Sequence, residues 1–158
     1  MFTGTRRTMS LFDRRRNVLR WSLATAAAMG LPAARACEYY TGTLRVTHPW
    51  TRATAADATS AVLCMRIDEV QEADRLISVS TPVAEGAEMG GAEAGVHVDV
   101  PIAQGSVLEL TDSGLHVRLT GLKQGLQVGR EYPLTLGFER SGLVLARLSV
   151  DFTTMRFR

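Results

Sequence analysis

Apolar and polar residues alternate along Ser113-Gly114-Leu115-His116-Val117-Arg118-Leu119-Thr120-Gly121-Leu122. Successive side chains of a β-strand point to opposite faces, so this alternation predicts a strand with one apolar face. The leucines and the valine of the strand would then face a core. His116 and Arg118 would share the other face, near the surface, where His116 is a candidate metal ligand.

The same alternation recurs along most of the chain, and segments rich in glycine and proline separate the alternating stretches. It predicts short strands at residues 43–47, 61–67, 75–80, 95–101, 106–111, 115–122, 132–138 and 144–152. His48-Pro49-Trp50 is expected to end the first strand, and residues 84–95, with four glycines, are expected to form a loop. Because no segment has the pattern of an amphipathic helix, the fold class is all-β: an antiparallel sandwich or barrel of about eight strands.

The first 36 residues have the three parts of a secretory signal peptide. An arginine-rich segment, residues 14–20, precedes a short apolar run, and an Ala-x-Ala cleavage site precedes Cys37. Residues 15–20 are similar to the twin-arginine export signal, and a general Sec signal is the alternative. The apolar run is about half of the ~20 residues that a membrane-spanning helix needs. We therefore expect residues 37–158 to form one periplasmic domain without a membrane span, and Arg35 disfavours a lipoprotein anchor at Cys37.

The net charge of +2 arises from this leader. Residues 1–36 hold seven of the 18 basic residues and one of the 16 acidic residues, so residues 37–158 carry a net charge of −4. Residues 37–158 therefore have no excess of basic residues that would indicate nucleic-acid binding. The sequence also lacks a nucleophile elbow, a phosphate-binding loop and the ligand spacing of a zinc site, and we therefore do not expect an enzyme.

Two cysteines, Cys37 and Cys64, remain after the predicted cleavage. An exported protein resides where disulfides persist, so one bridge between them is possible. The alternative is a free thiol at Cys37 and a buried, small apolar residue at Cys64. A bridge requires that the two Cα atoms lie within about 7 Å of each other.

Four segments in order resemble the periplasmic copper chaperones called PCu(A)C, and the likeness extends over residues 44–150. His48-Pro49-Trp50-Thr51-Arg52 is similar to the opening Trp-x-Arg segment of that family. The other similar segments are residues 73–84, 107–122 and 132–139, the last of which contains Pro133-Leu134-Thr135-Leu136. The resemblance implies a cupredoxin-like Greek-key β-sandwich, in agreement with the fold class predicted from the strand pattern.

The resemblance also implies a Cu(I) site of two histidines and two methionines, which are soft or neutral ligands that suit Cu(I). His116 matches the histidine of the family's His-x-Met motif, but Arg118 stands in place of the methionine. Gly90 stands where the second histidine is expected, and His97 is the one ligand type near the place of the second methionine. Because Met89 adjoins Gly90, we expect a degraded or rebuilt copper site formed from His116, Met89 and His97.

Two functions follow from these residues. The first is an exported copper chaperone-like protein that binds Cu(I) and passes it to an acceptor such as a respiratory oxidase assembly component. The second is a non-copper binding or interaction module on the same fold, because the charge of Arg118 disfavours a cation beside His116 and favours an anion or an acidic partner. Convergence of Met89, His97 and His116 would favour the first function. A pairing of Arg118 with an acid such as Glu109 would favour the second.

Overall fold

The computed structural model describes residues 37–152, so the predicted signal peptide, residues 1–36, lies outside the described residues. Its elements are β1 (Glu38–Tyr40), β2 (Arg45–Arg52), β3 (Ser60–Asp68), β4 (Asp74–Ser80), β5 (Gly86–Gly90), the short 3-10 helix η1 (Gly91–Glu93), β6 (Val100–Ile102), β7 (Leu108–Leu110), β8 (His116–Thr120), β9 (Glu131–Phe138) and β10 (Gly142–Asp151). Within the described residues, no helix is long and apolar enough to cross a membrane.

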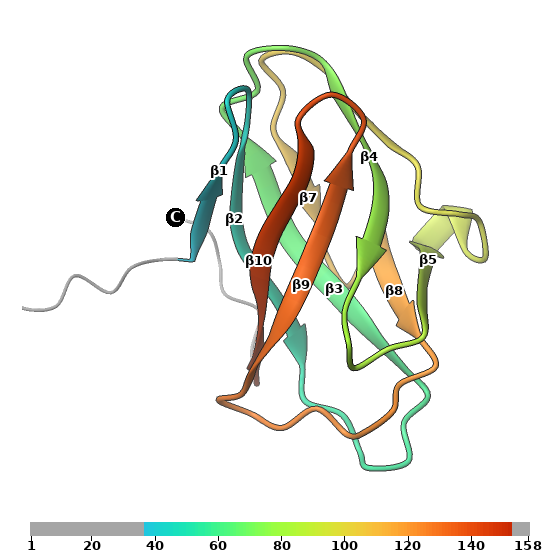
Figure 1. The fold of residues 1–158 in the computed structure, drawn as a ribbon. Helices are drawn as coiled ribbons and strands as arrows, with labels where there is room; N and C mark the ends of the chain where they lie inside the picture. The colour runs from blue at the N-terminus through green and yellow to red at the C-terminus, as the bar shows by residue number, and fades with distance from the viewer. Residues whose placement is uncertain (1–36, 153–158) are drawn as a thin grey trace, which may run out of the picture. The chain divides into compact units, whose positions relative to one another are not determined.

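The strands form one strongly curled sheet in the order β5-β8-β3-β2-β10-β9-β4-β6, with β1 added to β2 and β7 added to β3. Figure 1 shows β10, β9 and β4 in front of β3 and β8, so the curled sheet makes two layers. Neighbouring strands are antiparallel except for β10 and β2, which run parallel. The predicted all-β sandwich is confirmed, with ten strands within residues 37–152 in place of about eight.

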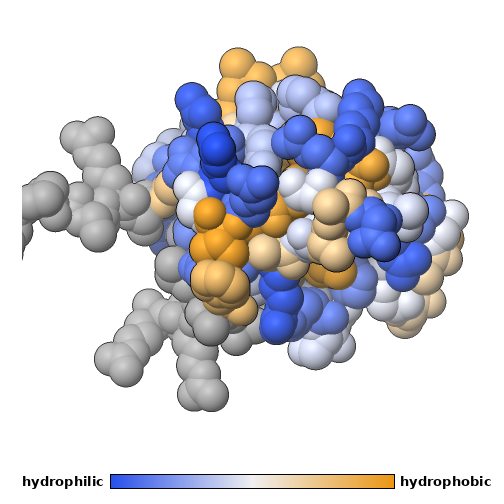
Figure 2. Space-filling model, turned by 90° about the horizontal axis from the view of Figure 1, so that it is seen from below, coloured by the Kyte–Doolittle hydropathy of each residue, from blue (hydrophilic) through white to orange (hydrophobic). Residues whose placement is uncertain are grey.

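The core lies between the layers and is built from the inward-facing half of each alternating strand. In β3, the residues Ala61, Leu63, Met65 and Ile67 are all buried, as their spacing predicts. The other strands contribute their own alternate residues: Val117 and Leu119 of β8, Leu134, Leu136 and Phe138 of β9, and Val144, Ala146, Leu148 and Val150 of β10. At the lower end of Figure 1, hydrophobic and hydrophilic residues are intermixed on the surface (Figure 2).

Strand β2 extends five residues beyond the end that the sequence predicts, through His48-Pro49-Trp50. A register shift between Thr47 and Trp50 interrupts its pairing with β3 at the proline, where a ladder donor is missing. His48 takes up the irregularity with a φ of 46°, a left-handed conformation that few non-glycine residues adopt. Proline therefore sits in a bulge and does not end the strand.

Strand β5 lies in the segment predicted as a loop. It pairs antiparallel with β8 along its whole length, from Gly86 opposite Thr120 to Gly90 opposite His116. Met89 anchors it, since this side chain is fully buried in the core. The local pattern of this glycine-rich segment indicates no strand. Burial of Met89 and pairing with the distant strand β8 nevertheless order it as one.

A buried carboxylate, Asp74, ties β4 to the turn between β9 and β10. It accepts hydrogen bonds from the backbone N–H groups of Arg75 (2.7 Å), Arg140 (2.9 Å) and Ser141 (3.0 Å), and from the Ser141 hydroxyl (2.6 Å). Burial raises the pKa of the Asp74 carboxyl, but the hydrogen bonds from Ser141, Arg140 and Arg75 outweigh burial and leave the pKa below its usual value. The charged form is therefore the form that stabilises this corner of the fold.

We expect Asp74→Asn to lower the free energy of unfolding by about 2–3 kcal/mol, because an amide nitrogen cannot accept the hydrogen bonds that one carboxylate oxygen accepts. The depressed pKa also predicts that wild-type stability is lost as the pH falls below the ordinary aspartate value of about 3.9, and that the variant loses less. Urea denaturation between pH 7 and pH 2 measures both. Asp57→Asn, in an exposed loop, is the control; equal losses in both variants would contradict the assigned role.

Candidate functional site

The register of β5 and β8 sets the candidate site on the outer face of their layer. His116 lies opposite Gly90, and Arg118 lies opposite Glu88. Between them, Val117 is buried in the core opposite Met89. Directly opposed residues of an antiparallel pair share one face, so the face with His116 also carries Gly90, Glu88 and Arg118.

His116 is buried, with 8% of its surface exposed, whereas the sequence predicts a position near the surface. Its imidazole lies over Gly90, so that a Cβ atom added at that glycine would collide with Nε2 and Cδ2 of the ring. The histidine therefore occupies the space in which any side chain at position 90 would begin. The missing Cβ of Gly90 is the physical reason that an outward-facing histidine is buried.

A backbone carbonyl orients the imidazole of His116. Nδ1 lies 2.9 Å from the carbonyl oxygen of Gly114, which can only accept a hydrogen bond. Nδ1 therefore carries the proton, and in the neutral ring the lone pair lies on Nε2. Among residues 37–152, Nε2 of His116 has no hydrogen-bond partner. A ring held through one nitrogen, with the other free, is the usual arrangement of a metal-binding histidine.

Arg118 is paired with Glu88 across the two strands, with 3.6 Å between Nη1 and Oε1. Both side chains are about a third exposed, so the pair contributes little to stability. The guanidinium lies on the same face as His116 and opposes the approach of a cation, while Glu88 offsets part of that charge. The sequence suggested Glu109 as an acidic partner; in the structure, Glu109 pairs with Arg66 at 3.1 Å.

His97 lies on the other side of β5 from β8. It is directly opposite Glu88 in an isolated antiparallel bridge, and its side chain is exposed. This segment is held to β5 by two backbone bonds: the N–H of Met89 donates to the Val96 carbonyl (2.7 Å), and the N–H of Gly95 donates to the Met89 carbonyl (3.1 Å). His97, Glu88 and Arg118 therefore form one row across the outer face, beside His116 and Gly90.

Met89 is placed apart from the other two predicted ligands. Its side chain is fully buried and faces the core, because it alternates with Glu88 and Gly90 along β5. The structure thus brings His116 and His97 to one face and does not bring Met89 to it. Sequence reasoning missed Glu88 and the Gly114 carbonyl. Period-2 alternation through residues 86–90 would have placed Glu88 beside Gly90, had that segment been recognised as a strand.

The arrangement does not supply four copper ligands. Position 90 has no side chain, position 118 holds a paired guanidinium, and the nearest methionine lies inside the core. Across residues 37–152, there is also no group of three or more histidine, cysteine, aspartate or glutamate side chains that could hold a metal ion. The residues present therefore fit a site with one or two imidazoles and do not fit a site with two histidines and two methionines.

The two cysteines are free thiols and lie on opposite sides of β2. Cys37 precedes β1, and its carbonyl accepts a hydrogen bond from the N–H of His48 (2.7 Å). Cys64 belongs to β3, where it lies opposite Trp50. The structure does not bring these residues together. Burial, and to a lesser degree the nearby charge of Asp112, raise the pKa of the Cys64 thiol to about 11.

Comparison with known proteins places the fold among copper-binding domains. The family model of LpqE-like lipoproteins matches residues 44–150. The copper-bound PCuAC domain from PmoF2 is 27% identical, with 73% of this chain and 98% of that chain covered and a TM-score of 0.67. The apo PCuAC domain from PmoF1 is 28% identical over 73% and 99% of the two chains, also with a TM-score of 0.67.

A more distant likeness concerns the fold alone. The solution structure of CuI-DR1885 from Deinococcus radiodurans is 21% identical over 84% of this chain and 87% of that chain, with a TM-score of 0.58. No curated protein sequence matches the chain at a significant level. The similar structures confirm the predicted cupredoxin-like sandwich.

We expect Gly90→Ala to lower the free energy of unfolding by about 1–3 kcal/mol, because the new methyl group must displace the His116 ring. The backbone itself tolerates alanine, since Gly90 is extended with a φ of −120°. In a His116→Ala background the cost should vanish, which a double-mutant cycle by chemical denaturation measures. Gly42→Ala, with no atom within 4 Å of the added Cβ, is the control. Additive effects of the two substitutions would contradict the stacked arrangement.

The cysteine geometry predicts two thiols of different reactivity. Cys37 is partly exposed and should react with a disulfide reagent in the native protein at pH 7, whereas buried Cys64 should react only after unfolding. Thiol counting with and without denaturant, on wild type and Cys37→Ser, measures this. A native protein without reactive thiols, whose two thiols appear only after reduction, would indicate a disulfide and contradict the structure.

Proposed function

This chain belongs to the LpqE-like family and is a PCu(A)C-type domain, and from this premise we propose that it is an exported, periplasmic copper chaperone-like protein that binds Cu(I) through a reduced site. The ligands of this site are His116 and His97, and Met89 takes no part in it. The protein is a carrier and not an enzyme. It passes Cu(I) to an acceptor protein such as a respiratory oxidase assembly component.

The observation that carries the proposal is the orientation of His116. The Gly114 carbonyl holds Nδ1 at 2.9 Å, so the lone pair lies on Nε2, the ring nitrogen that packs against Gly90, a residue without a side chain. Imidazole is a suitable ligand for copper, and a carbonyl behind it fixes the tautomer.

His97 is the second ligand because it lies on the same outer face and is exposed. It stands where the family resemblance places a methionine, so the exchange replaces a thioether by an imidazole. Two imidazoles bind Cu(I) less tightly than a set of four ligands, and the charge of Arg118 weakens binding further. A weakly held ion suits a protein that releases its cargo to an acceptor.

A second candidate function follows from the Glu88–Arg118 pair, because a pairing of Arg118 with an acid and the separation of Met89 from the two histidines are the arrangement expected of a non-copper module. This pair lies in the row beside His116, and its guanidinium stands where the resemblance places a copper ligand. A fixed positive charge at that point favours an anionic group. In this alternative the same face recognises an acidic partner or a small anion, and the domain does not handle copper.

Anaerobic titration of Cu(I) against a chromophoric competitor tests the proposal, in a Cys37→Ser background that removes the accessible thiol. We expect binding of one Cu(I), weakened at least about tenfold, or ~1.4 kcal/mol, by His116→Ala and by His97→Ala. Arg118→Met should tighten binding, because it removes a positive charge and adds a thioether.

Met89→Leu is the matched control, since it conserves the volume of a core side chain and should leave Cu(I) affinity unchanged. Loss of affinity in this variant would show that Met89 is a ligand after all. If neither the wild-type protein nor Arg118→Met competes with the chromophore, the copper proposal is wrong and the anion-binding alternative stands.

A further inference from the structure

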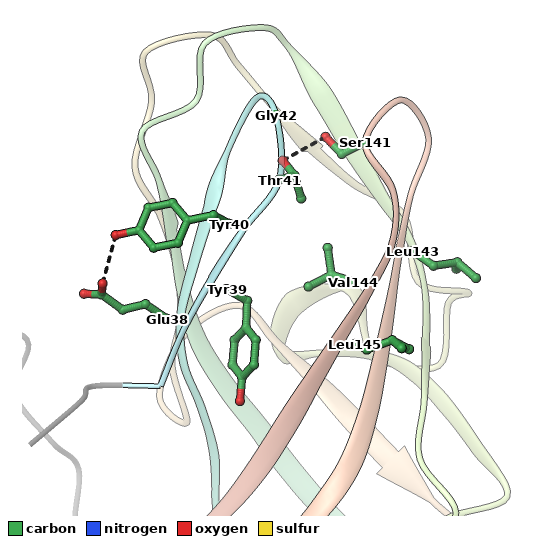
Figure 3. Close-up of a pocket in the computed structure, with 9 residues that line it drawn as sticks. All are labelled: Glu38, Tyr39, Tyr40, Thr41, Gly42, Ser141, Leu143, Val144 and Leu145. Atoms are coloured by element: carbon green, nitrogen blue, oxygen red, sulfur yellow. Dashed lines mark hydrogen bonds between the residues drawn. The ribbon is translucent and has the colours of Figure 1, made fainter.

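Side-chain contacts tether separate turns and strands of this fold to one another. In the pocket of Figure 3, the hydroxyl of Thr41, after β1, lies 3.5 Å from the hydroxyl of Ser141, in the turn between β9 and β10. Another tether joins the end of β2 to the turn before β8, where Nη2 of Arg52 donates a hydrogen bond to Oδ2 of Asp112 at 2.5 Å. This tether differs from the first, because the turn that it holds also carries the carbonyl oxygen that orients His116.

The turn consists of residues 111–114 and connects β7 to β8. The Gly114 N–H donates a hydrogen bond to the Thr111 carbonyl (3.2 Å), and the Thr111 N–H donates one to the Leu115 carbonyl (2.9 Å). The Gly114 carbonyl then lies 2.9 Å from Nδ1 of His116. Asp112 precedes Gly114 by two residues, so a contact that holds the carboxylate of Asp112 also limits the movement of this carbonyl.

The turn lies across the outer face of the sheet, which also carries His116. Cys64 of β3 alternates with the buried, inward-facing Leu63 and Met65, and its side chain therefore points outward. It is nevertheless only 2% exposed, and the backbone N–H of Asp112 faces its sulfur. The turn is therefore packed onto β3 at the same residue that contacts Arg52 of β2.

Gly91, directly after β5, confines the other end of the turn. A Cβ atom at this glycine would lie 2.7 Å from the carbonyl oxygen of Gly114, and its φ of 80° also favours glycine. The preceding Gly90 leaves space for the ring of His116. The carbonyl oxygen is thus held between Gly91 and Nδ1, and a displacement of the turn would separate it from the ring.

We propose that Arg52 and Asp112 are positioning residues for the candidate copper site, an inference that rests on the proposed function. Their ion pair holds the turn where the Gly114 carbonyl accepts the proton of Nδ1, which leaves the lone pair on Nε2 of His116. Neither side chain is a ligand. Without the pair the turn moves more freely, and the tautomer with its proton on Nε2, which cannot bind Cu(I) there, gains population.

NMR of the imidazole nitrogens of the ¹⁵N-labelled protein without copper, at pH 8, tests the positioning role. We expect the ring proton of wild-type His116 on Nδ1. Arg52→Gln and Asp112→Asn should each lower the fraction of this tautomer about two- to threefold, the range that loss of an exposed ion pair permits. Arg52→Lys should restore most of it, because the ammonium group keeps the charge opposite Asp112.

The control variant is Glu109→Gln, in β7. It removes one negative charge three residues before Asp112 and breaks the exposed pair of Glu109 with Arg66 (3.1 Å). The tether at Asp112 stays intact in this variant, so the tautomer of His116 should stay as in the wild type.

Titration with Cu(I) in the Cys37→Ser background supplies a second readout. Because only the tautomer with its proton on Nδ1 offers Nε2 to the ion, the apparent affinity should fall in proportion to its fraction, about two- to threefold in both Arg52→Gln and Asp112→Asn. A charge effect alone would act in opposite directions, since loss of a cation strengthens the binding of Cu(I) and loss of an anion weakens it.

An unchanged tautomer in Arg52→Gln or Asp112→Asn, or an equal shift in Glu109→Gln, would overturn the positioning role. Affinity changes of opposite sign in Arg52→Gln and Asp112→Asn would overturn it as well. If the wild-type protein binds no Cu(I) while both variants still shift the tautomer, the role of the pair in orienting His116 stands and the copper function is wrong.

Discussion

The register of β3 is the constraint on which the other strands depend. β3 pairs with β2, β7 and β8, and its odd-numbered residues, including Leu63 and Met65, are buried without exception. A shift of one residue would move that whole apolar set to the outer face, so the register is strongly specified. Because Leu63 lies opposite Val117, the same register turns His116 outward. Burial of leucines and valines therefore sets the position of His116 on the outer face, without any contribution from metal binding.

What happens on that outer face is decided by side-chain size and charge. Because Gly90 has no side chain, the His116 ring packs over it and is buried, with its tautomer fixed by the Gly114 carbonyl. Arg118 and Glu88 form an ion pair in the next row of the same face. A curled sheet of this kind tolerates such exchanges, because the residues on its outer face take no part in the core between its two layers. A domain can thus keep the PCu(A)C fold while its ligand set changes, and the fold alone does not establish copper transfer.

The sequence was sufficient to predict the strands with clear alternation, such as residues 61–67 and 132–138, and the outward face of His116. It was insufficient where structure depends on distant partners. β5 has no local strand signal and is ordered by β8 and by burial of Met89; β1 is only three residues long and is ordered by β2. The burial of His116 depends on a glycine 26 positions earlier, which no local pattern around the histidine reveals.

The irregularity at His48-Pro49 divides one edge of β2 between two strands. Before it, the free side of β2 pairs with β1; after it, the same side pairs with β10. Because both strands pair with one edge of β2, β10 must separate from β2 where β1 begins. The proposed copper ligands lie on β8 and beyond β5, at the far end of the strand order.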